Sequence, residues 1–229
     1  LTYPTDAINV GTKKMSVAGS GNFTGGRELE YTVYTCNTTP LLTLSQTEYT
    51  YDETAKTPAV TATVNGRQLV EGVDYEVAYS NNINAEAGAK VTVTAKGNYG
   101  FTAIDRYFHI GKADSVIETA PEPRNFTYDA LSHYLVTEGS VKGGTFEYKL
   151  ESGEWTKDIP KAKDAGEYTV WYRVAGDSNY NGIDEKSVKV TIAKKDIADA
   201  TVVLGPSLTY NREEQEQTIF HVRFDNQLN

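Results

Sequence analysis

Residues 86–99, EAGAKVTVTAKGNY, decide the fold of this chain. After Gly88, the segment 90–95 alternates polar and apolar side chains without interruption, and the turn Gly97-Asn98-Tyr99 follows it. Successive side chains of a β-strand point to opposite faces, so this alternation predicts a strand that buries one face. The Gly-Asn-aromatic turn marks the place where the chain reverses into the next strand.

Three landmarks of this stretch and its surroundings recur along the chain with a common period. The Asn-aromatic turn is centred on Asn22, Asn98 and Asn179, which are 76 and 81 residues apart. A glycine precedes each turn at Gly11, Gly88 and Gly166, with spacings of 77 and 78 residues. Tyr-Asp or Tyr-Asn begins at Tyr51, Tyr128 and Tyr210, with spacings of 77 and 82 residues. Three landmarks with one period indicate tandem copies of a single unit.

Each period contains several short strand patterns. The longest, 167–174, places Tyr168, Val170, Tyr172 and Val174 on one face. Further strand patterns occupy residues 60–64, 75–79, 107–110, 146–150 and 188–192, and no segment has convincing helical periodicity. Short strands separated by turns every ten or so residues predict an all-β fold of tandem immunoglobulin-like β-sandwich domains. Because the linkers near residues 112 and 195 are brief, we expect the domains to form an elongated rod.

The composition excludes several classes of function. A net charge of -9, from 22 Lys+Arg against 31 Asp+Glu, argues against nucleic acid as a partner. No run approaches the roughly 20 apolar residues of a membrane-spanning helix, so we expect no membrane insertion of this segment. The lone cysteine, Cys36, excludes an intramolecular disulfide. Because Leu1 begins in the middle of a repeat pattern, we expect the chain to be cut from a larger protein.

Several runs carry a resemblance to a known family. They are LSQTEYTYD at 44–52, YSNN at 79–82, KGNY at 96–99 and DAGEYTV at 164–170. In these runs the chain resembles bacterial Ig-like surface repeats of the YDG or MBG type, and the resemblance covers essentially the whole chain. The third letter of the YDG motif departs from the family, being Glu53, Ala130 and Arg212. The resemblance implies a large secreted or wall-attached bacterial protein in which such repeats serve as stalks or adhesin modules.

Aligned on the family pattern, the array is cut within a repeat. Residues 1–37 correspond to the C-terminal half of an Ig-like repeat, 41–111 and 113–194 to complete repeats, and 197–229 to an N-terminal half. The two halves together supply nearly one repeat and lack about six residues. Since a half sandwich exposes an apolar sheet face, one hypothesis is head-to-tail self-association, in which 197–229 of one molecule completes 1–37 of a neighbouring chain. The alternative is a shifted phase with three units of about 76 residues each.

Several patterns that suggest chemistry are better explained by the repeat. The glycine-rich run 19–26 is followed by a strand instead of the helix that a phosphate loop needs. Residues 177–182 match the start of a calcium loop, but its twelfth position is Val188, so a surface turn is favoured over a weak calcium site that uses Glu185. Cys36 and the histidines lie apart and lack the spacing of zinc ligands; the histidines are His109, His133 and His221. We therefore predict no enzyme activity, no metal and no cofactor.

The leading interpretation is a structural or adhesive spacer, a stalk, in a bacterial cell-surface or secreted protein. Its expected location is extracellular, and its partners are other domains of the same surface protein. The alternative is a carbohydrate- or host-protein-binding module within an adhesin. For that alternative the candidate ligand contacts are Trp155 and Trp171, although packing in a core or on a strand surface is the commoner role of such residues.

Overall fold

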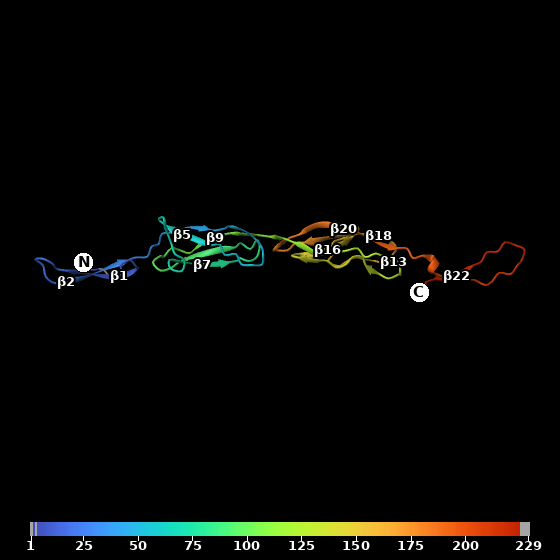
Figure 1. Cartoon of the computed structure of the whole chain (residues 1–229), viewed down its shortest axis with the longest axis horizontal. Helices are drawn as coiled ribbons and strands as arrows, with labels where there is room; N and C mark the ends of the chain where they lie inside the picture. The colour runs from blue at the N-terminus through green and yellow to red at the C-terminus, as the bar shows by residue number, and fades with distance from the viewer. Residues whose placement is uncertain (1, 3, 225–229) are drawn as a thin grey trace. The chain divides into compact units, whose positions relative to one another are not determined.

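The computed structural model describes residues 2 and 4–224 (Figure 1). The predicted all-β class of tandem immunoglobulin-like sandwiches is confirmed, because the described elements are strands and one short 3₁₀ helix, Ile197–Asp199. The chain divides into two compact units, Leu1–Ala113 and Asp114–Asn229. The outermost residues of the two expected half-repeats, 1, 3 and 225–229, lie outside the described residues. Within the described part, no helix is long and apolar enough to cross a membrane.

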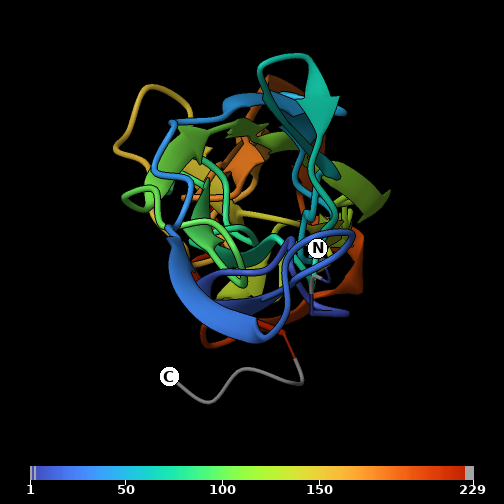
Figure 2. The ribbon, with the colours of Figure 1, turned by 90° about the vertical axis from the view of Figure 1, so that its left-hand side faces the viewer.

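The first unit contains a separate hairpin and one sandwich. The hairpin consists of β1 (Gly11–Ala18) and β2 (Gly26–Val33), which pair with each other and with no other described strand; both are drawn in blue in Figures 1 and 2. One sheet of the sandwich contains β3 (Leu41–Leu44), β5 (Val60–Val64) and β6 (Arg67–Gln68). The other contains β7 (Tyr75–Ser80), β8 (Lys90–Ala95) and β9 (Ile104–Tyr107). A parallel pair of β4 (Glu48–Thr50) and β10 (His109–Gly111) completes the sandwich, and the boundary between the units falls within β11 (Ala113–Asp114).

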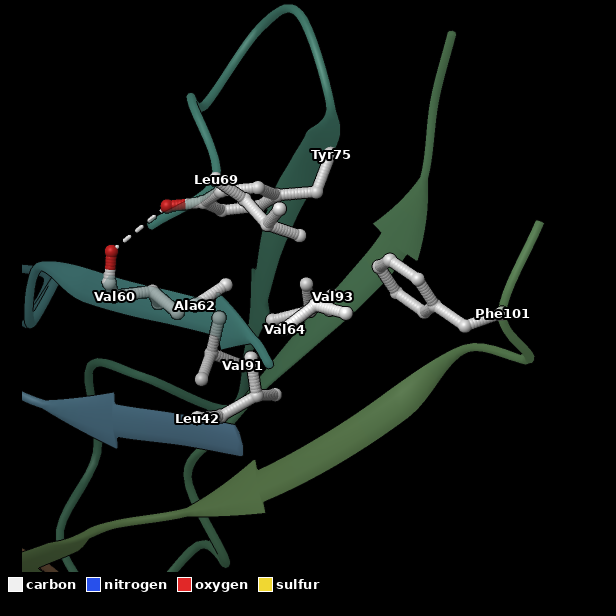
Figure 3. Close-up of a cluster of buried hydrophobic side chains, with 9 residues drawn as sticks. All are labelled: Leu42, Val60, Ala62, Val64, Leu69, Tyr75, Val91, Val93 and Phe101. Atoms are coloured by element: carbon white, nitrogen blue, oxygen red, sulfur yellow. Dashed lines mark hydrogen bonds between the residues drawn. The ribbon is translucent and has the colours of Figure 1, made fainter. Parts of the chain in front are cut away.

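The core of the first sandwich lies between the two sheets (Figure 3). Alternate residues of β5 and β8 point inward, so that Ala62, Val91 and Val93 are fully buried. The hydroxyl of Tyr75 donates a hydrogen bond to the carbonyl oxygen of Val60, 2.9 Å away, and so spans the two layers within the core. The remaining buried members of this cluster are Leu42, Val64, Leu69 and Phe101.

The strand predicted over residues 107–110 is divided between two sheets. Residue Tyr107 ends β9, whereas His109 begins β10 and pairs with β4. Between them, Phe108 donates its backbone N–H to Ala89, 3.0 Å away, and packs its ring against Tyr49 at a centroid distance of 5.7 Å. The alternation correctly predicted the extended backbone, but it does not encode a change of hydrogen-bonding partner.

The second unit also contains one sandwich and a hairpin. Its main sheet contains, in spatial order, β13 (Phe126–Thr127), β20 (Ile183–Ala193), β18 (Gly166–Ala175) and β16 (Thr145–Leu150). Two smaller pairs join β12 (Val116–Thr119) to β15 (Ser140–Lys142) and β14 (His133–Tyr134) to β17 (Lys161–Ala162). β19 (Tyr180–Asn181) lies beside Ser115, where the chain enters this sandwich. The hairpin contains β21 (Thr201–Leu204) and β22 (Ile219–Arg223).

The core of the second sandwich is more aromatic than that of the first. Tyr148 of β16 lies opposite Tyr172 of β18, and Phe146 packs against both rings at centroid distances of 5.9 and 6.1 Å. Leu135 and Val170 are fully buried in the same cluster. Alternate residues of β18 therefore serve as the predicted apolar face.

Each Tyr-Asp or Tyr-Asn landmark forms the same tight turn. The side-chain oxygens of Asp52, Asp129 and Asn211 accept the backbone N–H two residues further on, each at 2.9 Å. The residue between has a positive φ in all three turns: 70° at Glu53, 62° at Ala130 and 70° at Arg212. A left-handed backbone favours glycine, and these three residues adopt it with a side chain present. In the first copy, hydrogen bonds from Lys56 and Thr54 lower the pKa of Asp52 to about 2.

Replacing Ala130 by glycine is expected to stabilise the chain. Glycine avoids the penalty of the left-handed backbone but increases the entropy of the unfolded chain, so the net rise in the free energy of unfolding is about 0.5–1 kcal/mol. The matched control is Ala162→Gly in β17, where φ is not positive and the same change should lower stability by about 0.5–1 kcal/mol. Urea unfolding of the two variants measures the difference, and a loss of stability in both would contradict the explanation.

Candidate functional sites

The two tryptophans lie together on the outer face of the main sheet in the second sandwich. Trp171 belongs to β18, where its neighbours Val170 and Tyr172 point into the core, so its own side chain points away from the core. Trp155 lies next to Thr156, which bridges Tyr148 of β16 through two backbone hydrogen bonds of 2.7 and 2.9 Å. Both indole rings are half-buried.

Cations cover these rings. The ammonium of Lys149 lies 4.5 Å from the ring centroid of Trp155 and 5.4 Å from that of Trp171. The guanidinium of Arg173 lies 4.4 Å from the ring of Trp155. Each such cation–π contact contributes about 0.5–1 kcal/mol at an exposed site. A sugar that stacks on these rings must use the ring faces that the cations leave open or displace the cations.

Two carboxylates hold the cations in place. Glu147 accepts hydrogen bonds from Arg173 at 2.8 Å, and Glu185 accepts one from Lys149 at 3.0 Å. The sequence predicted Trp155 and Trp171 as candidate ligand contacts. The structure brings both rings to one cluster around Lys149. Their role in binding a ligand stays a prediction. The weak calcium site considered from the sequence would need the carboxylate of Glu185, which is instead paired with Lys149.

A second candidate site joins the N-terminal hairpin to the first sandwich. The side-chain oxygen of Asn98 accepts the backbone N–H of Val10 at 2.9 Å, and its amide group donates to the side chain of Asn9 at 3.0 Å. The backbone of the same turn pairs with the linker: Cys36 donates to the carbonyl oxygen of Asn98, and Gly100 donates to that of Cys36, both at 2.9 Å. The recurring turn therefore holds the chain that enters its sandwich.

The second sandwich has a similar contact at its own entrance. Ser115 donates both its backbone N–H and its hydroxyl to the carbonyl oxygen of Asn181, which follows the third copy of the turn. The side-chain amide of Asn181 donates to Asp114 at 2.9 Å. The sequence marks these turns as landmarks of the repeat, but their contact with the linkers is not predictable from it. In the first sandwich the contact is made by the recurring Asn98, whereas in the second it is made by Asn181, two residues after the recurring Asn179, so the repeat does not signal it.

A third cluster centres on His109 at one end of the first sandwich. Its Nδ1 atom lies 2.9 Å from Glu48, and its Nε2 atom lies 3.1 Å from Glu86. Hydrogen bonds to Glu48 and then to Glu86 raise the pKa of His109 above its ordinary value. The cluster is a small charge network beside the parallel pair β4–β10.

The remaining residues considered in the sequence are dispersed. Asp177 accepts the backbone N–H groups of Asn179 and Tyr180, as expected of a turn. His133 pairs with Asp129 at 2.9 Å and stacks on Phe126, whereas His221 lies in β22. Among the described residues, no group of three or more His, Cys, Asp or Glu side chains is arranged to hold a metal ion. Cys36 is a free cysteine within the linker contact.

Comparisons with known proteins give little beyond this geometry. No family model and no curated protein matches the chain. The chain is similar to a solved structure of the three Ig domains I67–I69 of titin, an E-to-A mutated variant, at 11% identity and a TM-score of 0.31, covering 82% of this chain and 75% of that one. It is also similar to a protocadherin gammaB7 EC3-6 cis-dimer structure at 12% identity and a TM-score of 0.28, covering 88% of this chain and 62% of that one. At these values neither likeness carries an argument about ligand, partner or role.

The pKa of His109 provides a test of its charge network. Because the pKa is raised in the folded state, the network stabilises the fold fully below the unfolded pKa of about 6.5, and this stabilisation is lost as pH rises through the folded pKa. An NMR titration of the imidazole should give a pKa above 6.5 in the wild type and a value closer to 6.5 in a Glu48→Gln, Glu86→Gln double variant. Equal values in the two proteins would refute the assignment.

Proposed function

We propose that this chain is a structural or adhesive spacer in a bacterial cell-surface or secreted protein, with no catalytic role. Its repeats hold another domain of the same protein away from the cell. The observation that carries the proposal is the parallel pairing of an early strand with the last strand in both sandwiches. This pairing suits a chain that is stretched between its ends.

In the first sandwich the parallel pair joins β4 to β10. Ile110 lies opposite Tyr49, and the pair is extended by two further backbone bonds. His109 donates to the carbonyl oxygen of Thr47 at 2.8 Å, and Tyr51 donates to that of Gly111 at 2.9 Å. Phe108 and Ile110 are buried beneath the pair.

In the second sandwich the corresponding pair joins β13 to the end of β20. Phe126 lies opposite Ile192, and Tyr128 donates to the carbonyl oxygen of Ala193 at 2.8 Å. The side chain of Asn125 adds another bond by accepting the N–H of Thr191 at 2.8 Å. The same arrangement is therefore built twice from different residues.

The direction of these strands determines how they respond to tension. When a chain is pulled from its ends, an early strand and a parallel last strand are drawn in opposite directions along their length. Their hydrogen bonds then bear the force together. In an antiparallel pair pulled at one end, by contrast, the bonds break one after another. Forced unfolding is governed by the unfolding rate. Because the bonds of the parallel pair must break together, that pair unfolds more slowly under load. It therefore withstands a higher force than an antiparallel pair with the same number of bonds.

The linker contacts support the same proposal. Asn98 ties the linker and the preceding residues Asn9 and Val10 to the first sandwich, and Asn181 ties Asp114 and Ser115 to the second. Linkers held in this way have less freedom to swing than flexible ones. A spacer needs this restriction in order to project a neighbouring domain.

Pulling the same sandwich in two directions tests the proposal. In a Cys36→Ser background, attachment through Asp114→Cys and Lys195→Cys loads the parallel pair β13–β20 along its length, after the antiparallel pair β12–β15 that precedes it. Attachment through Thr145→Cys and Ala175→Cys, which lie opposite each other in β16–β18, opens that antiparallel pair from one end. Single-molecule force spectroscopy should give the higher unfolding force for the first pair of attachment points. Equal forces, or a lower force between 114 and 195, would argue against a mechanical role.

The tryptophan cluster supports a second candidate function, recognition of a carbohydrate or host protein. If the outer sheet face binds a glycan by stacking, Trp171→Ala should weaken binding about tenfold, because one aromatic contact contributes up to about 1.5 kcal/mol. The matched control is Tyr107→Ala, which removes an exposed aromatic side chain from the first sandwich. A glycan array followed by titration measures both variants. No signal from intact, folded protein would count against this function.

A further inference from the structure

A cleft of about 870 Å³ lies in the second sandwich, and neither tryptophan lines it. Its walls come from Arg124 and from the segments 134–138 and 157–161. These walls are tied together by backbone bonds: Leu135 accepts the N–H of Arg124 at 2.9 Å and donates its own to the carbonyl oxygen of Pro160 at 3.0 Å. The volume lies within the range of sites that hold small ligands, and the bonded backbone makes the cleft preformed.

The cleft has an apolar floor and continues into a second cavity. Val136 is fully buried and Ile159 is half-buried, and both line the cleft. A neighbouring cavity of about 260 Å³ shares Ile159, Glu138 and Lys157 with it and reaches Phe146 of the core. Two cavities with common walls suit a chain molecule better than a single small ion.

Three cations line the cleft, although the chain as a whole has a net charge of -9: Arg124, Lys157 and Lys161. Within the described part of the chain, no carboxylate forms a salt bridge with any of the three. The cations of the tryptophan cluster differ in this respect, because Lys149 and Arg173 are each paired with a glutamate. The positive charge of the cleft is therefore not compensated by an ion pair.

Two of these cations are held by aromatic rings. The ammonium of Lys161 lies 4.1 Å from the ring centroid of Tyr134, its partner in the β14–β17 pair. The guanidinium of Arg124 lies 5.5 Å from the ring centroid of Phe126. A ring attracts a cation through its quadrupole and carries no net charge of its own. Both cations are thus positioned while their charge stays available to an anion.

The cleft also contains two exposed carboxylates, Glu138 and Asp158. They repel a plain polyanion, but an ionised carboxylate accepts hydrogen bonds from hydroxyl groups. A matching ligand therefore carries both anionic groups and hydroxyls, as an acidic saccharide does. An acidic peptide is disfavoured, because the backbone of Leu135 is bonded on both sides and cannot accept an added strand.

We propose that this cleft binds a saccharide chain that carries carboxylate groups, as uronic acids do. The three cations pair with the sugar carboxylates, the two acidic side chains accept hydrogen bonds from the sugar hydroxyls, and the apolar floor packs against the sugar rings. The inference is independent of the spacer function. It also uses a different surface from the tryptophan cluster, so either site can fail without the other.

Three probes of equal length test the ligand class by calorimetric titration of the full chain. A hexamer of galacturonic acid should bind, and its affinity should fall as salt screens the charges. The methyl-esterified hexamer keeps the hydroxyls but lacks the charge, and hexaglutamate keeps the charge but lacks the hydroxyls. Each of these controls should bind at least tenfold more weakly. Equal binding of the methyl ester would exclude the role of the cations, and equal binding of hexaglutamate would replace the saccharide by an acidic peptide.

Substitutions test the position of the site. Arg124→Gln and Lys161→Gln should each weaken binding of the galacturonic acid hexamer about tenfold, because each removes a charged hydrogen bond to the ligand. Lys161→Arg keeps the charge and should retain most of the affinity. The matched control is Lys189→Gln, which removes the same charge from β20 outside the cleft. Trp171→Ala should likewise leave this affinity unchanged.

The urea midpoint of each variant shows whether it is folded. If a change in ring packing destabilises Arg124→Gln or Lys161→Gln, Lys157→Gln repeats the test at an exposed cation of the same cleft. Three results would overturn the proposal: no binding of the galacturonic acid hexamer to the folded wild type, an equal loss of affinity in Lys189→Gln, or a loss of this binding in Trp171→Ala.

Discussion

Each sheet of this chain has one apolar face, and the need to cover that face determines the rest of the structure. Strands of four to six residues cannot remain ordered alone, but alternate side chains such as Val91 and Val93 become fully buried when a second sheet lies over them. The same alternation sends every other side chain outward. Chemistry is therefore confined to the outer faces and the turns. The Trp171 cluster occupies an outer face, and the Asn98 contact is made by a turn.

Closure of each sandwich depends on a change of pairing near its last strand. In the first sandwich Phe108 separates β9 from β10, and the chain then leaves one sheet to pair with β4. In the second, β20 is long enough to pair with β18 along most of its length and with β13 at its end. The two solutions differ in detail but give the same parallel contact. At the C-terminal end of each sandwich a short linker follows this contact directly, whereas at the N-terminal end the antiparallel strands β3 and β12 come first.

The sequence predicted the parts of the fold that depend on local alternation. Strands at 60–64 and 90–95 were predicted to the residue, because their inward positions are uniformly apolar. The two-residue strands β6, β14 and β17 were not predicted, because two residues carry no periodicity. The contact of His109 with Glu48 and Glu86 was also missed, since it joins residues 61 and 23 positions away. The proximity of Trp155 to Trp171 depends on strand register, which a single sequence does not specify.

The differing cores of the two sandwiches also affect how the chain folds. In the β7–β8 hairpin the central opposing residues are Val77 and Val93, whereas in the β16–β18 hairpin they include Tyr148 and Tyr172. Neighbouring repeats with the same strand order can exchange strands while they fold, and such misassembly is a characteristic failure of tandem arrays. The difference is local, because β7 also carries the buried Tyr75: an exchanged strand would place valine at the level where Tyr148 lies opposite Tyr172, or tyrosine at the level where Val77 lies opposite Val93. Unequal side-chain volume thus gives each repeat a means of selecting its own strands during synthesis.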